Sequence, residues 1–314
     1  MASIFVQIPS YRDHELPATV CDALAKMSYQ HDISFGIHNC QLPGDDIHMA
    51  CASHGSKGHG AAEICMHTST APDNLGLQRS RLIANGFYRG EDYYLQLDAH
   101  MRFVRDWDAK LVDMHQHYKR LGIAKPLISM YPPAYTLDIN GQAVLHPNET
   151  FYATRISFAE FPDKFTDTLI PSQQATASPE GCVYTSSVSG GFIFTDGSFA
   201  EITPNPLIAF WGEEILIAAR AFTSGFDLVT ATEDTVFHLY HSGQPFELTR
   251  RHHVWNDFPA EFAAMDTNSK AEIQRIFSDR VIGDGALGTV RTLDQFEEFA
   301  GLDFMSRQVT QVWC

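Results

Sequence analysis

An α/β fold with a mostly parallel central sheet is the fold class that this sequence predicts. Residues 4–8 are a short apolar run, residues 16–27 carry apolar side chains at helical spacing, and residues 33–37 are a second apolar run. Strand, helix and strand within about 35 residues make a βαβ unit, whose crossover favours parallel strands. The chain has 314 residues, 44% of them hydrophobic, which is enough to bury a sizeable core.

The alternation of helix and strand continues along the chain. Residues 78–88 have a helical pattern, and residues 93–97 form the next strand. Apolar side chains three and four residues apart predict a helix over 107–121, and a strand is expected at 127–131. Residues 140–181 are expected to be irregular. The later elements are a strand over 190–194 with a close backbone approach at Gly190-Gly191, a helix from 211 to Gly225, a strand over 236–240, and a helix capped by Thr292 and Gln295.

Charge and hydropathy exclude several classes of partner. The formal net charge of -16 disfavours binding to nucleic acid or to an anionic membrane, which both depend on Lys and Arg. No apolar run is long enough to span a membrane, and the first residues lack the pattern of a signal peptide. We therefore expect a cytoplasmic protein that binds no nucleic acid.

Six cysteines are scattered without a repeating framework, so we expect reduced thiols. A His- and Cys-rich segment at 48–67 could in principle hold zinc, because imidazole and thiolate are zinc ligands. Its spacing fits no compact zinc template, and its glycines are typical of a loop. A solvated loop is the preferred interpretation.

The stretch YYLQLDAH over residues 93–100 carries the clearest chemical signal. Side chains of a strand alternate, so Asp98 and His100 project to one side at the end of an apolar run. A carboxylate and an imidazole in this arrangement suit a divalent cation that keeps open coordination positions. The Asp-x-His pattern also occurs at 46–48 and 113–115, in a predicted loop and a predicted helix. Only the copy at 98–100 follows a strand.

Five segments spread along the chain match one group of enzymes. They are residues 8–13 (IPSYRD), 88–103 (YRGEDYYLQLDAHMRF), 212–221 (GEEILIAARA), 236–238 (VFH) and 291–293 (RTL). The chain resembles metal-dependent glycosyltransferases of the GT-A fold, a Rossmann-like fold that binds nucleotide sugars. The resemblance is closest to the (hydroxyproline) polypeptide α-N-acetylglucosaminyltransferase family, with a weaker similarity to the polypeptide N-acetylgalactosaminyltransferases. It implies a GT-A catalytic domain at 1–245, a helical extension at 246–304 and an unassigned tail at 305–314.

The resemblance implies a metal site and a donor substrate. Asp98, His100 and His238 would bind Mn²⁺, or Mg²⁺ in its place, and the cation would hold the diphosphate of a UDP-sugar. His241 is a rival third ligand, but it would face away from His238 on a regular strand. The transferred sugar is expected to be GlcNAc, with GalNAc, glucose and galactose as alternatives. The acceptor is expected to be a hydroxyl on a protein, a peptide or a glycan.

Further residues gain roles from the same resemblance. Ser10, Tyr11 and Arg12 follow the first strand, where α/β sheets place ligands, and would hold the uridine. Arg81 would assist the dianionic donor.

Three residues at the start of the helix after 210 would serve catalysis. Glu213 or Glu214 would orient the acceptor or the sugar, and Trp211 would stack on an apolar sugar face. The resemblance also implies retention of anomeric configuration. Front-face transfer is then the expected mechanism, because no residue is an evident covalent nucleophile.

Two other functions fit parts of the pattern. A catalytically weak module that binds nucleotide sugars or glycans would need no complete metal set. A glycoside hydrolase would use Glu213 or Glu214 with a second carboxylate and would not depend on Mn²⁺.

Overall fold

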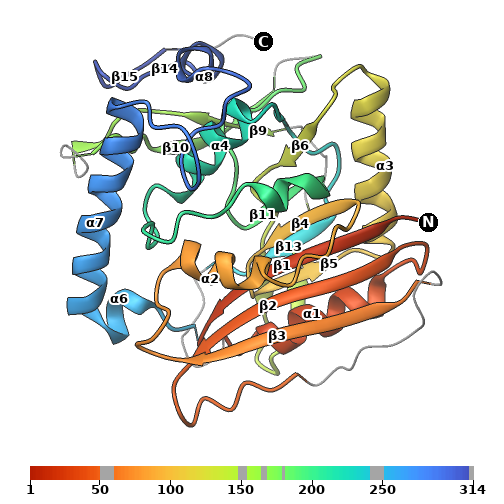
Figure 1. Ribbon diagram of the computed structural model, residues 1–314. Coiled ribbons are helices and arrows are strands. Elements are labelled where there is room, and N and C mark those ends of the chain that lie inside the picture. Colours follow the sequence, from red (N-terminus) through yellow and green to blue (C-terminus); the bar gives the residue numbers. More distant parts are fainter. Residues whose placement is uncertain (50–59, 148–153, 164–167, 179–180, 241–250, 311–314) are drawn as a thin grey trace.

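A computed structural model shows a seven-stranded sheet at the centre of the molecule (Figure 1). It describes residues 1–49, 60–147, 154–163, 168–178, 181–240 and 251–310. Only β11 runs antiparallel to its neighbours within this sheet, so the predicted α/β fold with a mostly parallel sheet is confirmed. In spatial order the strands are β12 (Asp227–Val229), β6 (Pro126–Ser129), β11 (Phe192–Asp196), β4 (Tyr93–Leu97), β1 (Ser3–Tyr11), β2 (Asp32–Gln41) and β3 (Ala62–Thr70).

Helices cover both faces of the sheet, because the buried strands carry apolar side chains on both sides. Ile4, Val6 and Ile8 pack with α1 (Leu16–Lys26) and α3 (Trp107–Arg120) in one core cluster. Phe5 belongs to the opposite cluster. The elements on that second face are α2 (Leu77–Asn85), α4 (Glu213–Thr223), the C-terminal half of α7 (Pro259–Ser278) and α8 (Leu293–Ala300).

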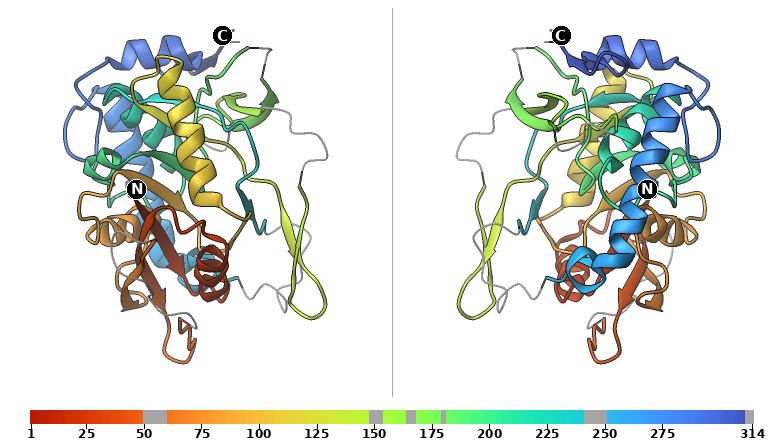
Figure 2. Two further views of the ribbon diagram at one scale, coloured as in Figure 1. Left: turned by 90° about the vertical axis from the view of Figure 1, so that its right-hand side faces the viewer. Right: turned by 90° about the vertical axis from the view of Figure 1, so that its left-hand side faces the viewer.

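Short antiparallel pairs surround the main sheet. The pair important for the site joins β5 (Met101–Phe103) to β13 (Val236–His238). The others are β7 (Tyr135–Leu137) with β8 (Ala143–Leu145), β9 (Thr154–Phe158) with β10 (Gln173–Ala177), and β14 (Leu302–Asp303) with β15 (Gln308–Val309). Figure 2 shows the β7–β8 hairpin standing away from the body of the molecule.

Three expectations need correction. The segment 48–67 is not a loop throughout, because residues from Ala62 onward form the edge strand β3, whose exposed side chains hide the usual alternation. The segment 140–181 contains β8, β9 and β10 rather than only irregular chain. Cys182 is disulfide-bonded, so the expectation of reduced thiols is wrong there. Cysteine spacing alone does not reveal which sulfur atoms meet in space.

The C-terminal region has more regular structure than the sequence pattern shows. The 20-residue helix α7 follows the short helix α6 (Val254–Asp257), and the capping box at Thr292 and Gln295 begins α8 as predicted. Helix α7 is hard to recognise because only four of its side chains are buried: Ser269, Ile273, Ile276 and Phe277. The division at 245 and 304 stays a prediction.

Candidate active site

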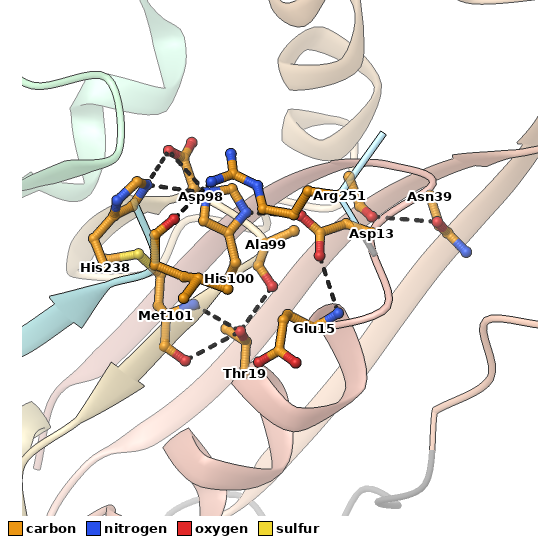
Figure 3. Close-up of polar contacts among 12 residues, drawn as sticks. Asp13, Glu15, Thr19, Asn39, Asp98, Ala99, His100, Met101, His238 and Arg251 are labelled. Atoms are coloured by element: carbon orange, nitrogen blue, oxygen red, sulfur yellow. Dashed lines mark hydrogen bonds and ion pairs between the residues drawn. The ribbon is translucent and has the colours of Figure 1, made fainter. Parts of the chain in front are cut away.

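Asp98, His100 and His238 come together at the edge of the sheet where β4 ends (Figure 3). Asp98 and His100 follow β4 directly, and the register of β13 on β5 places His238 opposite Met101. The Nε2 atoms of the two histidines are 3.0 Å apart, and His238 Nε2 is 3.2 Å from Asp98 Oδ2. One ligand atom from each residue lies within 4.8 Å of the others. The structure thus brings the three predicted ligands together.

The competing candidates do not form such a group in the described chain. Asp46 and His48 lie in a loop, and His115 is buried on α3 with its Nε2 3.3 Å from Asp196. His241 lies outside the described residues.

The environments of Asp98 and His100 favour the protonation states in which these side chains can bind a divalent cation. Burial and the nearby charge of Arg251 outweigh Asp13 and lower the pKa of His100 to about 4, so its imidazole is neutral. Burial opposes ionisation of Asp98, but His238, His100 and Arg81 together lower its pKa below the usual range. One ionised carboxylate and two imidazoles at this spacing are a donor set for Mn²⁺ or a similar ion.

Two glycines let the backbone approach the acidic groups closely, as the sequence predicted. A Cβ atom on Gly191 would lie 2.7 Å from Asp98 Oδ2, and one on Gly190 would lie 2.8 Å from Glu213 Oε2. These glycines precede β11, whose antiparallel pairing with β4 brings its start to the edge that carries Asp98. A residue with a Cβ atom at either position would force the neighbouring carboxylate to shift.

Arg81 is 1% exposed and does not line the pocket, but it contacts residues that do. It pairs with Glu213 through Nε at 2.5 Å, lies 3.6 Å from Asp98, and donates to the Gly190 carbonyl at 2.8 Å. Gln78 donates a second hydrogen bond to Glu213 at 2.7 Å. Arg81 therefore organises the acidic side of the site, and its direct contact with a donor stays a prediction.

Glu213 and Glu214 open α4 beside the three candidate ligands, and both line the pocket. Burial, with the added repulsion of Glu213 and Asp98, raises the pKa of Glu214 to about 7. Glu214 is thus able to carry or release a proton near neutral pH. Trp211 is 40% exposed and packs edge-on against Phe210, which lines the pocket.

The end of β1 supplies the opposite wall. Ser10 and Tyr11 line the pocket. The Tyr11 hydroxyl donates to Asp257 on α6 at 2.9 Å, and Arg12 pairs with Asp45 and Asp257, each at 2.8 Å. Arg12 therefore ties the end of β1 to α6.

These walls enclose a pocket of about 290 Å³ that reaches the three candidate ligands. Sequence reasoning missed several of its lining residues, notably Asp13, Arg251, Phe210, Trp255 and Phe262. Asp13 was visible in the IPSYRD segment. The other four had no signal, because an isolated arginine or aromatic residue in a sequence does not reveal that it faces a pocket.

Comparison with known proteins identifies the family. Residues 54–306, well over half of the chain, match the family model described as Glycosyltransferase (GlcNAc). The chain belongs to this family. The match begins after β2, so β1 with Ser10 and Tyr11 lies outside it.

Two solved structures resemble this chain to different degrees. The structure of GalNAc-T7 with UDP, GalNAc and Mn²⁺ superposes with a TM-score of 0.51 at 15% identity, covering 95% of this chain and 56% of that one. The chain thus spans little more than half of that relative. TarS of S. aureus in complex with UDP-GlcNAc is more distant, with a TM-score of 0.40 at 12% identity, covering 97% of this chain and 72% of that one. No curated protein gives a significant match. None of the helices in the described residues has the length and apolar character to cross a membrane.

Proposed function

We propose that this glycosyltransferase moves GlcNAc from UDP-GlcNAc to a hydroxyl acceptor and depends on Mn²⁺, with Mg²⁺ as the alternative ion. The observation that carries the proposal is the convergence of Asp98, His100 and His238 in the pocket that Glu213 and Glu214 also line. Family membership supports sugar transfer. GalNAc-T7, whose fold is similar, was solved with UDP, GalNAc and Mn²⁺, which supports the choice of donor class and ion.

The residues of the pocket divide into two groups by charge. Ser10 and Tyr11, at the end of β1, would receive the uridine half of the donor, because ligands of open α/β sheets bind beyond the strand carboxyl ends. The acidic half would receive the diphosphate only together with a cation, which would offset the negative charge of the leaving UDP. Four carboxylate residues line the pocket, Asp13, Asp98, Glu213 and Glu214, and a cation would offset their repulsion of the diphosphate.

We further propose retention of anomeric configuration by front-face transfer. Glu213 is held by Arg81 and Gln78 and is 4% exposed, so it is poorly placed to attack the sugar as a nucleophile. The bond between C1 and the diphosphate oxygen would break while the acceptor oxygen bonds C1 from the same side. The acceptor proton would pass to the departing diphosphate. Glu214 would orient the acceptor hydroxyl, and Trp211 would contact the acceptor at the rim.

The family resemblance also bears on the class of acceptor. The five matching segments support kinship with the hydroxyproline polypeptide α-N-acetylglucosaminyltransferases. The acceptor hydroxyl would then sit on a protein or peptide, with a glycan as the alternative. We also propose a cytoplasmic location.

Donor screening by mass spectrometry tests the proposal. UDP-sugars are incubated with the protein and Mn²⁺, and free sugar and glycosylated product are followed with and without EDTA. We expect turnover of UDP-GlcNAc that needs the metal, that Asp98→Asn abolishes, and that Asp46→Asn leaves intact. Asp46 is a matched control because it heads an Asp-x-His in a loop outside the candidate metal group. Metal-independent cleavage of glycosides without use of UDP-sugars would support a hydrolase instead.

A further inference from the structure

Asp13 is the residue beyond the candidate ligands that touches the site most directly. It lies between β1 and α1 and is 6% exposed. Its Oδ1 accepts a hydrogen bond from the Glu15 backbone N–H at 3.0 Å, and its Oδ2 contacts His100 Nδ1 at 2.7 Å (Figure 3). Both carboxylate oxygens therefore have fixed partners, so the carboxylate has one orientation.

The contact with Asp13 determines which nitrogen of His100 carries the proton. An ionised carboxylate only accepts hydrogen bonds, so Nδ1 must be the donor. A neutral imidazole then has its lone pair on Nε2. Nε2 is the atom that lies 3.0 Å from His238 Nε2 and 3.9 Å from Asp98 Oδ2. The opposite tautomer would place a hydrogen at the position needed for a metal ion.

His238 lacks a comparable support in the described part of the chain. Its Nδ1 is buried and has no hydrogen-bond partner among those residues. The backbone around His100, by contrast, is also held by Thr19 of α1, which donates to the Ala99 carbonyl at 2.7 Å and accepts from Met101 N–H at 2.8 Å. The start of α1 therefore fixes both the backbone and the ring of His100.

We infer that Asp13 is a positioning residue that holds His100 in the tautomer and orientation needed to bind the divalent ion of the proposed function. Asp13 would not itself contact the ion. Carboxylates that support a metal-bound histidine in this way raise metal affinity by about 10- to 100-fold in other proteins. The inference rests on the proposed metal site, since Asp13 would have no such effect if His100 were not a ligand.

A double-mutant cycle on Mn²⁺ affinity tests the inference without any activity assay. Mn²⁺ binding to the protein is measured by titration calorimetry for wild type, Asp13→Asn, His100→Ala and the double variant. Asp13→Asn keeps an acceptor for the Glu15 N–H while removing the charge. We expect it to weaken Mn²⁺ binding about 10- to 100-fold, and to have no further effect once His100 is alanine. Asp227→Asn is the matched control, because Asp227 pairs with Arg291 at 2.6 Å and lies outside the pocket lining.

A second readout uses the tautomer itself in the metal-free protein. The nitrogen chemical shifts of His100 should report protonation at Nδ1 in wild type and a shift toward Nε2 protonation in Asp13→Ala. Unchanged Mn²⁺ affinity in Asp13→Asn, together with a strong loss in His100→Ala, would overturn the role of Asp13 and leave the proposed function standing. Unchanged affinity in His100→Ala would overturn the metal site itself. If Asp13→Asn lowers Mn²⁺ affinity equally in the wild-type protein and in His100→Ala, Asp13 has a general structural role instead.

Discussion

Replacement of Gly191 by alanine is a small change that should disable the site. The added Cβ atom would lie 2.7 Å from Asp98 Oδ2 and 3.2 Å from Asp98 Cγ, whereas ordinary contacts begin at 3.4 Å. The Asp98 carboxylate would have to move by roughly 0.7 Å, and displacements near 1 Å at a reacting centre cost about 100-fold. Gly191 has no positive φ, so alanine introduces no backbone strain. We therefore expect about 100-fold weaker Mn²⁺-dependent transfer with an unchanged fold.

Gly86→Ala provides the comparison for this experiment. Its Cβ would meet only the Ile83 carbonyl oxygen at 3.1 Å, at the end of α2 and outside the pocket lining. Initial rates with UDP-GlcNAc and Mn²⁺ titrations are measured for both variants, with circular dichroism as the check on folding. Full activity and full Mn²⁺ affinity in a folded Gly191→Ala protein would refute the placement of Asp98 at the reacting centre.

Three further predictions concern the same site. Arg81→Met should lower the free energy of unfolding, measured by urea titration, by about 3–5 kcal/mol, because it leaves Glu213 buried without its charged partner; a loss below about 1 kcal/mol would contradict this. Glu214 has a pKa raised to about 7, so the folded state holds its proton more tightly than the unfolded state and stability falls as pH rises from about 4.5 through 7. In the metal-free protein, Glu214→Gln should therefore have a higher unfolding temperature than wild type at pH 8 but not at pH 4. The gain in free energy of unfolding at pH 8 should be at most about 3 kcal/mol; an equal effect at both pH values would disprove the prediction. His238→Ala should weaken Mn²⁺ and UDP binding strongly in calorimetry and His241→Ala only mildly; the reverse order would reassign the third ligand.

The elements that sequence predicts best are those with a regular pattern and a buried face. The βαβ start, α3, β4 and the capping box of α8 follow from apolar spacing and end signals. The edge strand β3 was missed, and the predicted helical extension did not define the bounds of α7, because most side chains of these elements are exposed or only half-buried. Their formation depends on neighbours that are distant in sequence.

The same distinction applies to the site. Asp98 and His100 are recognisable in the sequence because both candidate ligands lie within three consecutive residues after a predicted strand. His238 was found only through the family resemblance, since the pairing of β13 with β5 joins segments far apart in the chain. Asp13 acts through a hydrogen bond to His100, and no local pattern reports such a contact. The partners of Arg81 are hidden for the same reason, because Glu213 is 132 positions away.

Calorimetric titration of UDP into the protein, with Mn²⁺ and after chelation by EDTA, tests the central claim most directly. The donor diphosphate must enter a pocket lined by Asp13, Asp98, Glu213 and Glu214, and a bound cation would offset their negative charge. We predict measurable UDP binding with Mn²⁺, little or none after chelation, and none in Asp98→Asn under either condition. Equal affinity for UDP in all of these experiments would contradict a metal-dependent nucleotide-sugar site at Asp98, His100 and His238.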